Sequence, residues 1–401
     1  MKIGIFSVGS SEKPIIFSIK KNKIDFAIFL CSKWTYSKIE IIKKELENEN
    51  IELKKIKDFV VENFQDINSC YKKSKEIVSY LSDFDNNEII IDITGGTKVM
   101  SSALLSATAG KGYKYFYVGS IGERTGNVND KEMCLYPFED PYLIFHENEK
   151  KLFEIFFNNY AFENASKIFE NLKLIKKYEE DLYSGLRIIS ESYSKWDRFE
   201  ITNNEKIKII LKDLNEGKRK IETYYRYNEK EKPIIDIFQI EENIKFLEKL
   251  FSIESSKFLI IDLFFNSQRR AEQKRYDDAT ARLYATIEQL AHFELNKKYN
   301  INSSNLEVKK LPEYLREKYF KEDVLALCKK YDILHDLNNE LGKKFKEKEE
   351  ELKKILDARN NSILAHGLNS ITKEQYEKFA NIVKEFINPE FEIKFPKIRF
   401  D

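Results

Sequence analysis

An arginine and a histidine near the C-terminal end of the chain have the side chains that acid–base chemistry on a phosphate group requires. Arg359 is followed directly by Asn360 and, after six intervening residues, by His366. A guanidinium can hold a phosphate or stabilise charge that develops on it, and an imidazole near its ordinary pKa can pass a proton to or from a hydroxyl. On a helix with about 100° per residue, this spacing returns to nearly the same face. It therefore predicts that the two side chains lie together and that Asn360 orients one of them; the alternative is a structural histidine beside a turn of small residues.

A second stretch, residues 89–100, has the composition of a phosphate-binding turn. An apolar run suited to a buried strand is followed by Thr94, Gly95, Gly96, Thr97 and Lys98. The glycines can adopt positive φ and let the backbone approach a ligand, and Thr97 stands where a helix N-cap belongs. Free N–H groups at a helix start favour anions. Because the spacing matches neither GxxxxGK[ST] nor GxGxxG, an ordinary strand-to-helix turn is the alternative interpretation.

The elements that would position the second stretch form an α/β pattern. Strand-like runs alternate with helical ones, and strands are expected at residues 2–8, 25–30, 51–58, 89–93, 113–119 and 133–138. Such alternation predicts a parallel sheet with right-handed crossovers, in which ligands bind at the carboxyl ends of the strands. Three of those ends are small and polar: Gly9-Ser10-Ser11, Cys31-Ser32-Lys33 and Thr94-Gly95-Gly96-Thr97. The sequence therefore predicts a crevice suited to a polyhydroxylated, phosphorylated ligand.

The rest of the chain is helical in pattern. Residues 147–254 are low in glycine and contain no motif with recognisable chemistry, so we expect them to space or pack the two ends. From residue 255 on, an apolar helix face precedes the Arg359 region, and four arginines are expected to decorate the positions around it. These are Arg269, Arg270, Arg275 and Arg282.

Composition excludes several classes of protein. A formal net charge of +1 argues against a globally basic coat for nucleic acid. The four cysteines are far apart, which predicts neither a zinc site nor a disulfide framework. No apolar run is long enough for a membrane span or a signal peptide, so a cytoplasmic protein is expected. His335-Asp336 lacks the further ligands of a metal site. In Tyr276-Asp277-Asp278, either aspartate is expected to favour the start of a helix or to pair with Arg282. His292 is expected to be a surface or interface residue with a hydrogen-bond partner, and no metal is predicted.

The two ends together resemble the CARF–HEPN ribonucleases that accompany type III CRISPR systems. The residues that carry the resemblance are Asp92-Ile93-Thr94-Gly95-Gly96-Thr97-Lys98 at one end and Arg359-Asn360 with Ala365-His366 at the other. The latter fits the HEPN pattern of Arg, four to six residues, then His. The run from Arg269 to Tyr284 also looks like the start of the helical half in one branch of that family.

The resemblance implies three regions: a Rossmann-like CARF domain over residues 1–145, a helical middle over 146–254 and a helical HEPN domain over 255–401. It implies that the CARF sheet dimerises and binds a cyclic oligoadenylate, tetra-adenylate rather than hexa-adenylate, as an allosteric activator. The matching ligand-binding positions are Gly9, Ser10, Ser11, Thr94, Gly95, Gly96, Thr97 and Lys98.

For the other end, the resemblance implies cleavage of single-stranded RNA without a metal, in a homodimer. Arg359 would stabilise the phosphate, His366 would act as general acid or base, and Asn360 would orient one of them. The RNA 2′-OH would attack, leaving a 2′,3′-cyclic phosphate. Two alternatives stay open: a CARF-type sensor or regulator without nuclease activity, and a HEPN toxin restrained by its N-terminal domain. Whether the CARF site also cleaves its activator is open as well.

Overall fold

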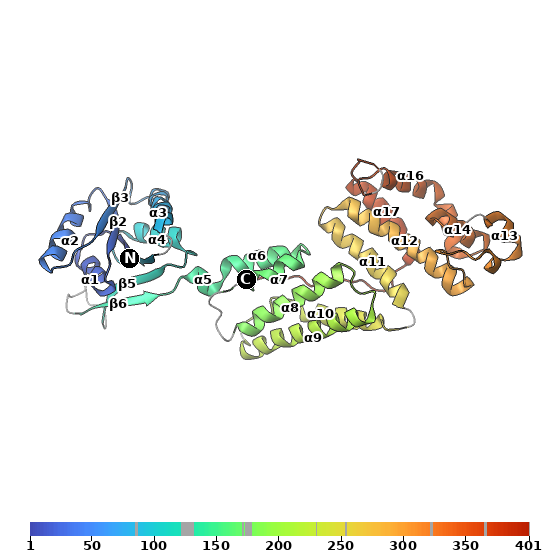
Figure 1. Ribbon diagram of the computed structural model, residues 1–401, viewed down its shortest axis with the longest axis horizontal. Coiled ribbons are helices and arrows are strands. Elements are labelled where there is room, and N and C mark those ends of the chain that lie inside the picture. Colours follow the sequence, from blue (N-terminus) through green and yellow to red (C-terminus); the bar gives the residue numbers. More distant parts are fainter. Residues whose placement is uncertain are drawn as a thin grey trace. The chain divides into compact units, whose positions relative to one another are not determined.

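The chain forms two compact units in the computed structural model, one comprising Met1–Asn148 and the other most of the chain from Glu149 on (Figure 1). The structure describes residues 1–84, 87–121, 132–170, 172, 179–229, 231–252, 255–320, 324–364 and 367–400. Each unit is described separately below.

The first unit is built on a six-stranded sheet with the strand order β3-β2-β1-β4-β5-β6. The strands are β1 (Lys2–Ser7), β2 (Phe26–Ser32), β3 (Lys55–Val61), β4 (Glu88–Asp92), β5 (Lys114–Ser120) and β6 (Met133–Phe138). Its helices are α1 (Lys13–Asn22), α2 (Ser37–Asn48), α3 (Ile67–Leu81), α4 (Lys98–Thr108) and α5 (Pro141–Phe145), with a short 3₁₀ turn at Ser82–Phe84.

The sheet is parallel from β3 through β5, but β6 runs antiparallel to β5. The prediction of a wholly parallel sheet is therefore wrong for this last strand. A parallel neighbour requires a crossover connection, usually a helix, whereas an antiparallel strand can follow a short link. Pro137 in β6 also suits an edge strand, because proline has no N–H to donate to a further neighbour.

Two apolar clusters cover the two faces of the sheet. In β1, Ile3 and Ile5 point toward α3 and α4, whereas Phe6 and Val8 at its end point toward α1 and α2. This alternation follows from the period of two in a strand. Both faces are buried, which explains why the strands read as nearly continuous apolar runs.

The second unit is helical and begins within α6. Its helices are α6 (Glu147–Asn158), α7 (Phe162–Ile168), α8 (Glu180–Asp197), α9 (Asn204–Tyr227), α10 (Ile237–Lys249), α11 (Ser255–Glu272), α12 (Tyr276–Tyr299), α13 (Glu313–Tyr319), α14 (Leu327–Asp336), α15 (Glu340–Glu347), α16 (Glu349–Asn360) and α17 (Lys373–Ile387), with a 3₁₀ turn at Val308–Lys310.

Two glycines let α8 and α9 approach closely. A Cβ on Gly185 would lie 2.9 Å from the Gly217 carbonyl oxygen, and a Cβ on Gly217 would lie 3.0 Å from the Gly185 oxygen. Farther along the chain, α17 packs against both α11 and α12. Its start is specified locally by a capping box between Thr372 and Gln375.

The segment after α17 returns to the middle helices of the same unit. The ring of Phe395 lies 4.5 Å from that of Tyr193 and 5.0 Å from that of Trp196, centroid to centroid. Ile398 forms an isolated antiparallel bridge with Ile235. These contacts agree with the extended arm that the prolines in this segment suggest. Within the described part of the chain, none of the helices has the length and apolar character of a membrane span.

Candidate functional site

The carboxyl ends of β1 and β4 lie side by side at one edge of the sheet. The two strands are parallel neighbours in register up to Phe6 opposite Asp92. Just beyond, the Ser7 hydroxyl donates a hydrogen bond to the Gly95 carbonyl oxygen at 2.6 Å, and the Ser101 hydroxyl of α4 donates to the same oxygen at 2.7 Å. The turn after β4 is thus tied to the end of β1, which brings two of the predicted strand ends together.

The glycines at these ends are required by the close approach of the two loops. A Cβ on Gly95 would lie 2.1 Å from the Ser7 carbonyl oxygen, and a Cβ on Gly9 would lie 2.7 Å from the Gly96 nitrogen. Gly96 has a φ of +76°, in the left-handed region that favours glycine. The glycines therefore have a packing role here, in addition to any contact with a ligand.

Both threonine hydroxyls of the turn are bonded within the protein. The Thr97 hydroxyl accepts from the Met100 N–H at 3.2 Å, which confirms the predicted N-cap of α4, and donates to the Phe64 carbonyl oxygen at 3.0 Å. The Thr94 hydroxyl accepts from the Val118 N–H at 2.7 Å. These side chains shape the turn, and Thr97 in particular has little hydrogen-bonding capacity left for a ligand.

Asp92 is the buried acid at the base of the turn. One of its carboxylate oxygens accepts from the Thr94 N–H at 2.8 Å. Burial raises the pKa of this carboxyl group, and hydrogen bonds from Ser18 and Thr94 oppose the rise only in part. Asp92 therefore stabilises the local backbone and is screened from a ligand at the surface.

The groups that this edge offers to solvent are Ser10, Ser11 and Lys98, all exposed. Among the residues described, Lys98 has no ion-pair partner, so its positive charge at the start of α4 is available to an anion. Trp34 follows β2 on the same edge with 84% of its surface exposed. Trp34 directly follows a strand end in the sequence, but it is not among the predicted site residues.

Arg359 is held by an aromatic ring at the C-terminal end of α16. Its guanidinium carbon lies 4.3 Å from the centroid of the Tyr284 ring of α12, and its Nη1 donates to the Asn360 side-chain oxygen at 3.1 Å. Burial, and then the charge of Glu288, raise the pKa of Tyr284, while the charge of Arg359 lowers it. Tyr284 is thus a site residue that was not predicted, although it lies in the run from Arg269 to Tyr284 that resembles the start of the helical half.

The chain leaves the helix directly after Arg359 and Asn360, so the prediction that Arg359 and His366 share one helical face is wrong. The Asn361 side chain donates to the Asp357 carbonyl oxygen at 2.9 Å, a local bond that competes with helix continuation. The chain then folds back, because the Gly367 N–H donates to the Ser362 carbonyl oxygen at 3.1 Å. A Cβ on Gly367 would lie 1.9 Å from the Asn361 oxygen, so only glycine fits. His366 itself lies outside the described residues.

Exposed apolar side chains surround this loop. Ile363, Leu364 and Leu368 have 62%, 55% and 93% of their surfaces exposed. Neighbouring apolar groups of this size at a surface are typical of an interaction site.

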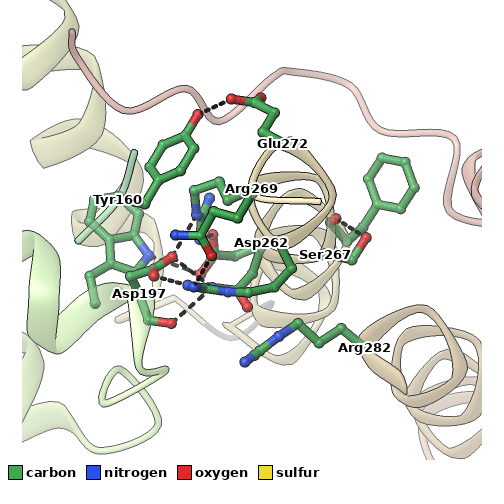
Figure 2. A network of polar contacts seen from close by, with 12 residues as sticks. Tyr160, Asp197, Asp262, Ser267, Arg269, Glu272 and Arg282 are labelled. Atoms are coloured by element: carbon green, nitrogen blue, oxygen red, sulfur yellow. Dashed lines mark hydrogen bonds and ion pairs between the residues drawn. The ribbon is translucent and has the colours of Figure 1, made fainter. Parts of the chain in front are cut away.

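Arg269 and Arg270, expected around an apolar helix face, form a buried network with acids of two helices. Figure 2 shows Arg269 beside Asp197 and Asp262. Arg269 donates to Asp197 of α8 at 2.8 Å and lies 3.4 Å from Asp262, and Arg270 pairs with the other oxygen of Asp197. The indole N–H of Trp196 donates to Asp262 at 2.8 Å. Buried arginines need such partners, and Asp197 lies in the middle region, where the sequence showed no recognisable motif.

The residues rejected as metal ligands have ordinary partners. Asp278 pairs with Arg282 at 3.0 Å, as predicted, and Asp277 accepts from the Ile371 N–H at 3.1 Å. His292 lies 2.7 Å from the Ser303 hydroxyl. Among the residues that the structure describes, no three His, Cys, Asp or Glu side chains are grouped so as to hold a metal ion.

Two family models match separate parts of the chain. Residues 14–134 match the Card1 CARF domain, and residues 248–390 match the Csm6 HEPN domain. No curated protein matches the chain.

Solved structures resemble the chain at low sequence identity. Csm6 of Enterococcus italicus, bound to cyclic hexa-2′-fluoro-hexa-dAMP, is 12% identical over 96% of this chain and 94% of its own, with a TM-score of 0.61. Can2 of Sulfobacillus thermosulfidooxidans, in complex with cyclic tetra-adenylate, is 14% identical over 50% of this chain and 69% of its own, with a TM-score of 0.25. VC1899 of Vibrio cholerae is 11% identical over 67% and 68%, with a TM-score of 0.27. The comparison of folds rests on the first of these.

The N-terminal match lies on the sheet with the paired strand ends, and the C-terminal match contains Arg359 and the loop that folds back behind it. The order of the two domains is the one that the sequence motifs implied, and the fold agrees with that of Csm6 over nearly the whole chain. The chain therefore belongs to the CARF–HEPN ribonucleases that accompany type III CRISPR systems.

Proposed function

We propose that the protein is a homodimeric endoribonuclease that cleaves single-stranded RNA after a cyclic oligoadenylate binds at the edge of its N-terminal sheet. The observation that carries the nuclease assignment is the loop after α16. The two sides of this loop are bonded to each other beside the helix end that carries Arg359: the Gly367 N–H donates to the Ser362 oxygen at 3.1 Å, and the Asn369 N–H donates to the Asn361 oxygen at 3.2 Å. A short loop closed in this way supports a histidine near the guanidinium.

In this mechanism the RNA supplies its own nucleophile. The 2′-oxygen attacks the adjacent phosphorus, and the bond from phosphorus to the 5′-oxygen of the next nucleotide breaks. His366 takes part in the proton transfers, from the 2′-hydroxyl or to the leaving 5′-oxygen, and Arg359 stabilises the charge on the phosphate oxygens. Asn360, hydrogen-bonded to Arg359, holds the guanidinium in place. The products are a 2′,3′-cyclic phosphate and a 5′-hydroxyl, and the scheme requires no metal.

Dimerisation would bring two such sets of residues together. The exposed Ile363, Leu364 and Leu368 beside Arg359 support a second copy as the partner of this surface. A two-fold pair of Arg359 and His366 could then serve one RNA strand, with one histidine as base and the other as acid.

The sensor assignment rests on the groups that the sheet edge offers to solvent. Ser10, Ser11 and Lys98 are exposed beside the start of α4, where backbone N–H groups and a positive charge favour phosphates. Two copies of this edge would match a ring of repeating phosphates. We take cyclic tetra-adenylate as the activator, as the family resemblance implies. Cyclic hexa-adenylate is the comparison, because the Csm6 of similar fold is bound to a cyclic hexa-nucleotide analogue.

The test is cleavage of a labelled single-stranded RNA in EDTA, with no activator, with cyclic tetra-adenylate or with cyclic hexa-adenylate. We expect activator-dependent cleavage that Arg359→Ala and His366→Ala each reduce roughly hundredfold or more, while activator binding measured by calorimetry is unchanged. His335→Ala, at an exposed histidine of α14, is the matched control. Cleavage without activator would favour the restrained toxin, and binding without cleavage would favour the sensor or regulator.

A further inference from the structure

A pocket in the second unit is lined by arginines that neither candidate site uses. It has a volume of about 370 Å³ and lies between the start of α7, the end of α8 and the α11–α12 turn. Its walls include four arginines from three segments of the chain, namely Arg198, Arg270, Arg275 and Arg282. The volume falls within the range of small-ligand sites, roughly 300–1,000 Å³.

Positive charge exceeds negative charge in the lining of this pocket, although one lining arginine, Arg198, also pairs with Glu200 outside it at 3.1 Å. The lining acids are Glu163, Asp197 and Asp278, three carboxylates against four guanidinium groups. Two of the acids are shared with cations outside the lining. Glu163 also pairs with Lys167 at 2.8 Å, and Asp197 also pairs with Arg269 at 2.8 Å.

Among the residues described, Asp278 is the one lining acid that forms ion pairs only with lining arginines. Two arginines share its carboxylate. Arg275 lies 2.8 Å from one of its oxygens and Arg282 lies 3.0 Å from the other. One carboxylate can neutralise one of these two charges. A cation therefore remains at the pocket wall without full compensation.

Arg270 lines the pocket and is nearly inaccessible to solvent, with 6% of its surface exposed. It pairs with Asp197 and donates from Nη1 to Gln273 at 2.8 Å, but its buried Nε has no hydrogen-bond partner in the described part of the chain. Burial, and then the nearby charge of Arg282, lower the pKa of Arg270 to about 10. An anion in the pocket would supply a hydrogen-bond acceptor for Arg270 and reduce the repulsion between the neighbouring arginine charges.

We propose that this arginine pocket binds the phosphate group of a nucleotide or of an oligonucleotide. Guanidinium groups match phosphate oxygens with two parallel hydrogen bonds, and arginine is the side chain that proteins use most for this purpose. Phosphate-bearing ligands are also the class whose charge balances the surplus. A ligand of mononucleotide size fits the volume.

The arginine pocket is distinct from the Arg359 site. Arg282 and Tyr284 are two residues apart on α12, so their side chains point about 200° apart around the helix. The ring of Tyr284 contacts the Arg359 guanidinium, whereas Arg282 extends from α12 toward the side of Asp197 (Figure 2). The inference therefore does not depend on the nuclease assignment or on the identity of the activator.

The test measures binding by calorimetry with the full chain and three probes: inorganic phosphate, adenosine 5′-monophosphate and a 2′-O-methyl oligoribonucleotide that resists cleavage. We expect Arg275→Gln and Arg282→Gln to weaken binding of at least one probe roughly tenfold or more, because each removes a charged hydrogen bond. Arg226→Gln, at an exposed arginine of α9 outside the pocket, is the matched control and should bind as the parent does.

The pattern of binding identifies the source of the phosphate. Binding of phosphate or the mononucleotide indicates a free nucleotide, and binding of the oligonucleotide alone indicates a strand phosphate. Because the Arg275 side chain is more than half exposed, its variant should keep the parent's melting temperature and test the pocket without unfolding it. The proposal is overturned if no probe binds the parent, or if Arg275→Gln and Arg226→Gln bind every probe equally well.

Discussion

Arg359 owes its position to a ring rather than to a carboxylate. In the described part of the chain it stacks on Tyr284 and bonds Asn360, and it forms no ion pair. Its charge is therefore not neutralised by a neighbour and remains available to a phosphate. The sheet edge shows a similar contrast: among the described residues Lys98 has no ion-pair partner, while the Thr97 hydroxyl both donates and accepts a hydrogen bond within the turn.

Replacing Tyr284 should reduce catalysis by releasing the arginine. A cation–π contact contributes about 0.5–2 kcal/mol, so we expect Tyr284→Leu to slow single-turnover RNA cleavage by roughly 2- to 30-fold, with little change in activator binding. Tyr284→Phe keeps the ring and should restore most of the rate. Equal rates for the leucine and phenylalanine variants would contradict a positioning role for the ring.

Thr97 and Lys98 should separate into a stability effect and a ligand effect. Thr97→Ala removes the cap of α4 and should lower the free energy of unfolding by about 1 kcal/mol, seen as a lower melting temperature, whereas Thr97→Ser should retain the cap. Lys98→Ala should leave the melting temperature unchanged and weaken activator binding. If Lys98→Ala bound the activator with the parent's affinity, the assignment of Lys98 to the ligand-binding site would be wrong.

At the scale of elements, the sheet edge depends on two loops that pack without side chains between them. The turn after β4 lies against the end of β1, and the Gly95 and Gly9 positions leave no room for a Cβ. The loop after α16 follows the same principle at Gly367. Each candidate site is therefore built where a glycine lets one backbone segment touch another.

Gly95→Ala should destabilise the first unit. The added methyl group would meet the Ser7 carbonyl oxygen, a backbone atom that cannot turn aside, and overpacking of this kind costs about 1–3 kcal/mol. Thermal unfolding followed by circular dichroism should show a lower midpoint, together with weaker activator binding. Ser11→Ala, at an exposed position of the same edge, should leave the midpoint unchanged.

The local sequence pattern was sufficient to predict most helices and strands. It was insufficient where a contact with a residue distant in sequence determines the structure. The strands expected at residues 113–119 and 133–138 agree with β5 and β6, because periodicity and flanking turn residues are local signals. The direction of β6 is set by its antiparallel pairing with β5, which hydrophobicity does not encode. The burial of Arg269 and Arg270 could not be predicted from the local sequence because Asp197, their partner, is about seventy residues away. The end of α16 was missed because Gly367 acts through a fold-back contact with Asn361.

At the scale of the whole molecule, the helical middle and the HEPN helices are joined within one unit by buried charge. Asp197 at the end of α8 receives both Arg269 and Arg270 of α11, and the Asn266 side chain donates to its backbone oxygen at 3.0 Å. Arg269 also lies over the Phe395 ring, with 4.1 Å between the guanidinium carbon and the ring centroid. The middle region is therefore structurally continuous with the region that carries Arg359.

Asp197→Asn should destabilise this unit strongly. Removing one partner of a buried ion pair leaves charge uncompensated and typically costs about 3–5 kcal/mol, so we expect a markedly lower denaturation midpoint. The matched control is Asp213→Asn, which removes a partly exposed partner of Lys195 at 3.0 Å and should cost at most about 1 kcal/mol. Similar losses in the two variants would mean that the buried network contributes little to stability.

The return of residues 395–398 to the middle helices sets an order of events during synthesis on the ribosome. The Asn158 side chain bonds the Ile398 backbone in both directions, at 2.7 and 2.8 Å, across 240 residues of sequence. Domains generally fold as units while the N-terminal part emerges first. The first unit can therefore mature while translation continues, but the packing around α6 and α8 cannot close until residue 398 has left the exit tunnel. A nascent chain would thus complete its CARF domain before the unit that contains the HEPN helices reached its final fold.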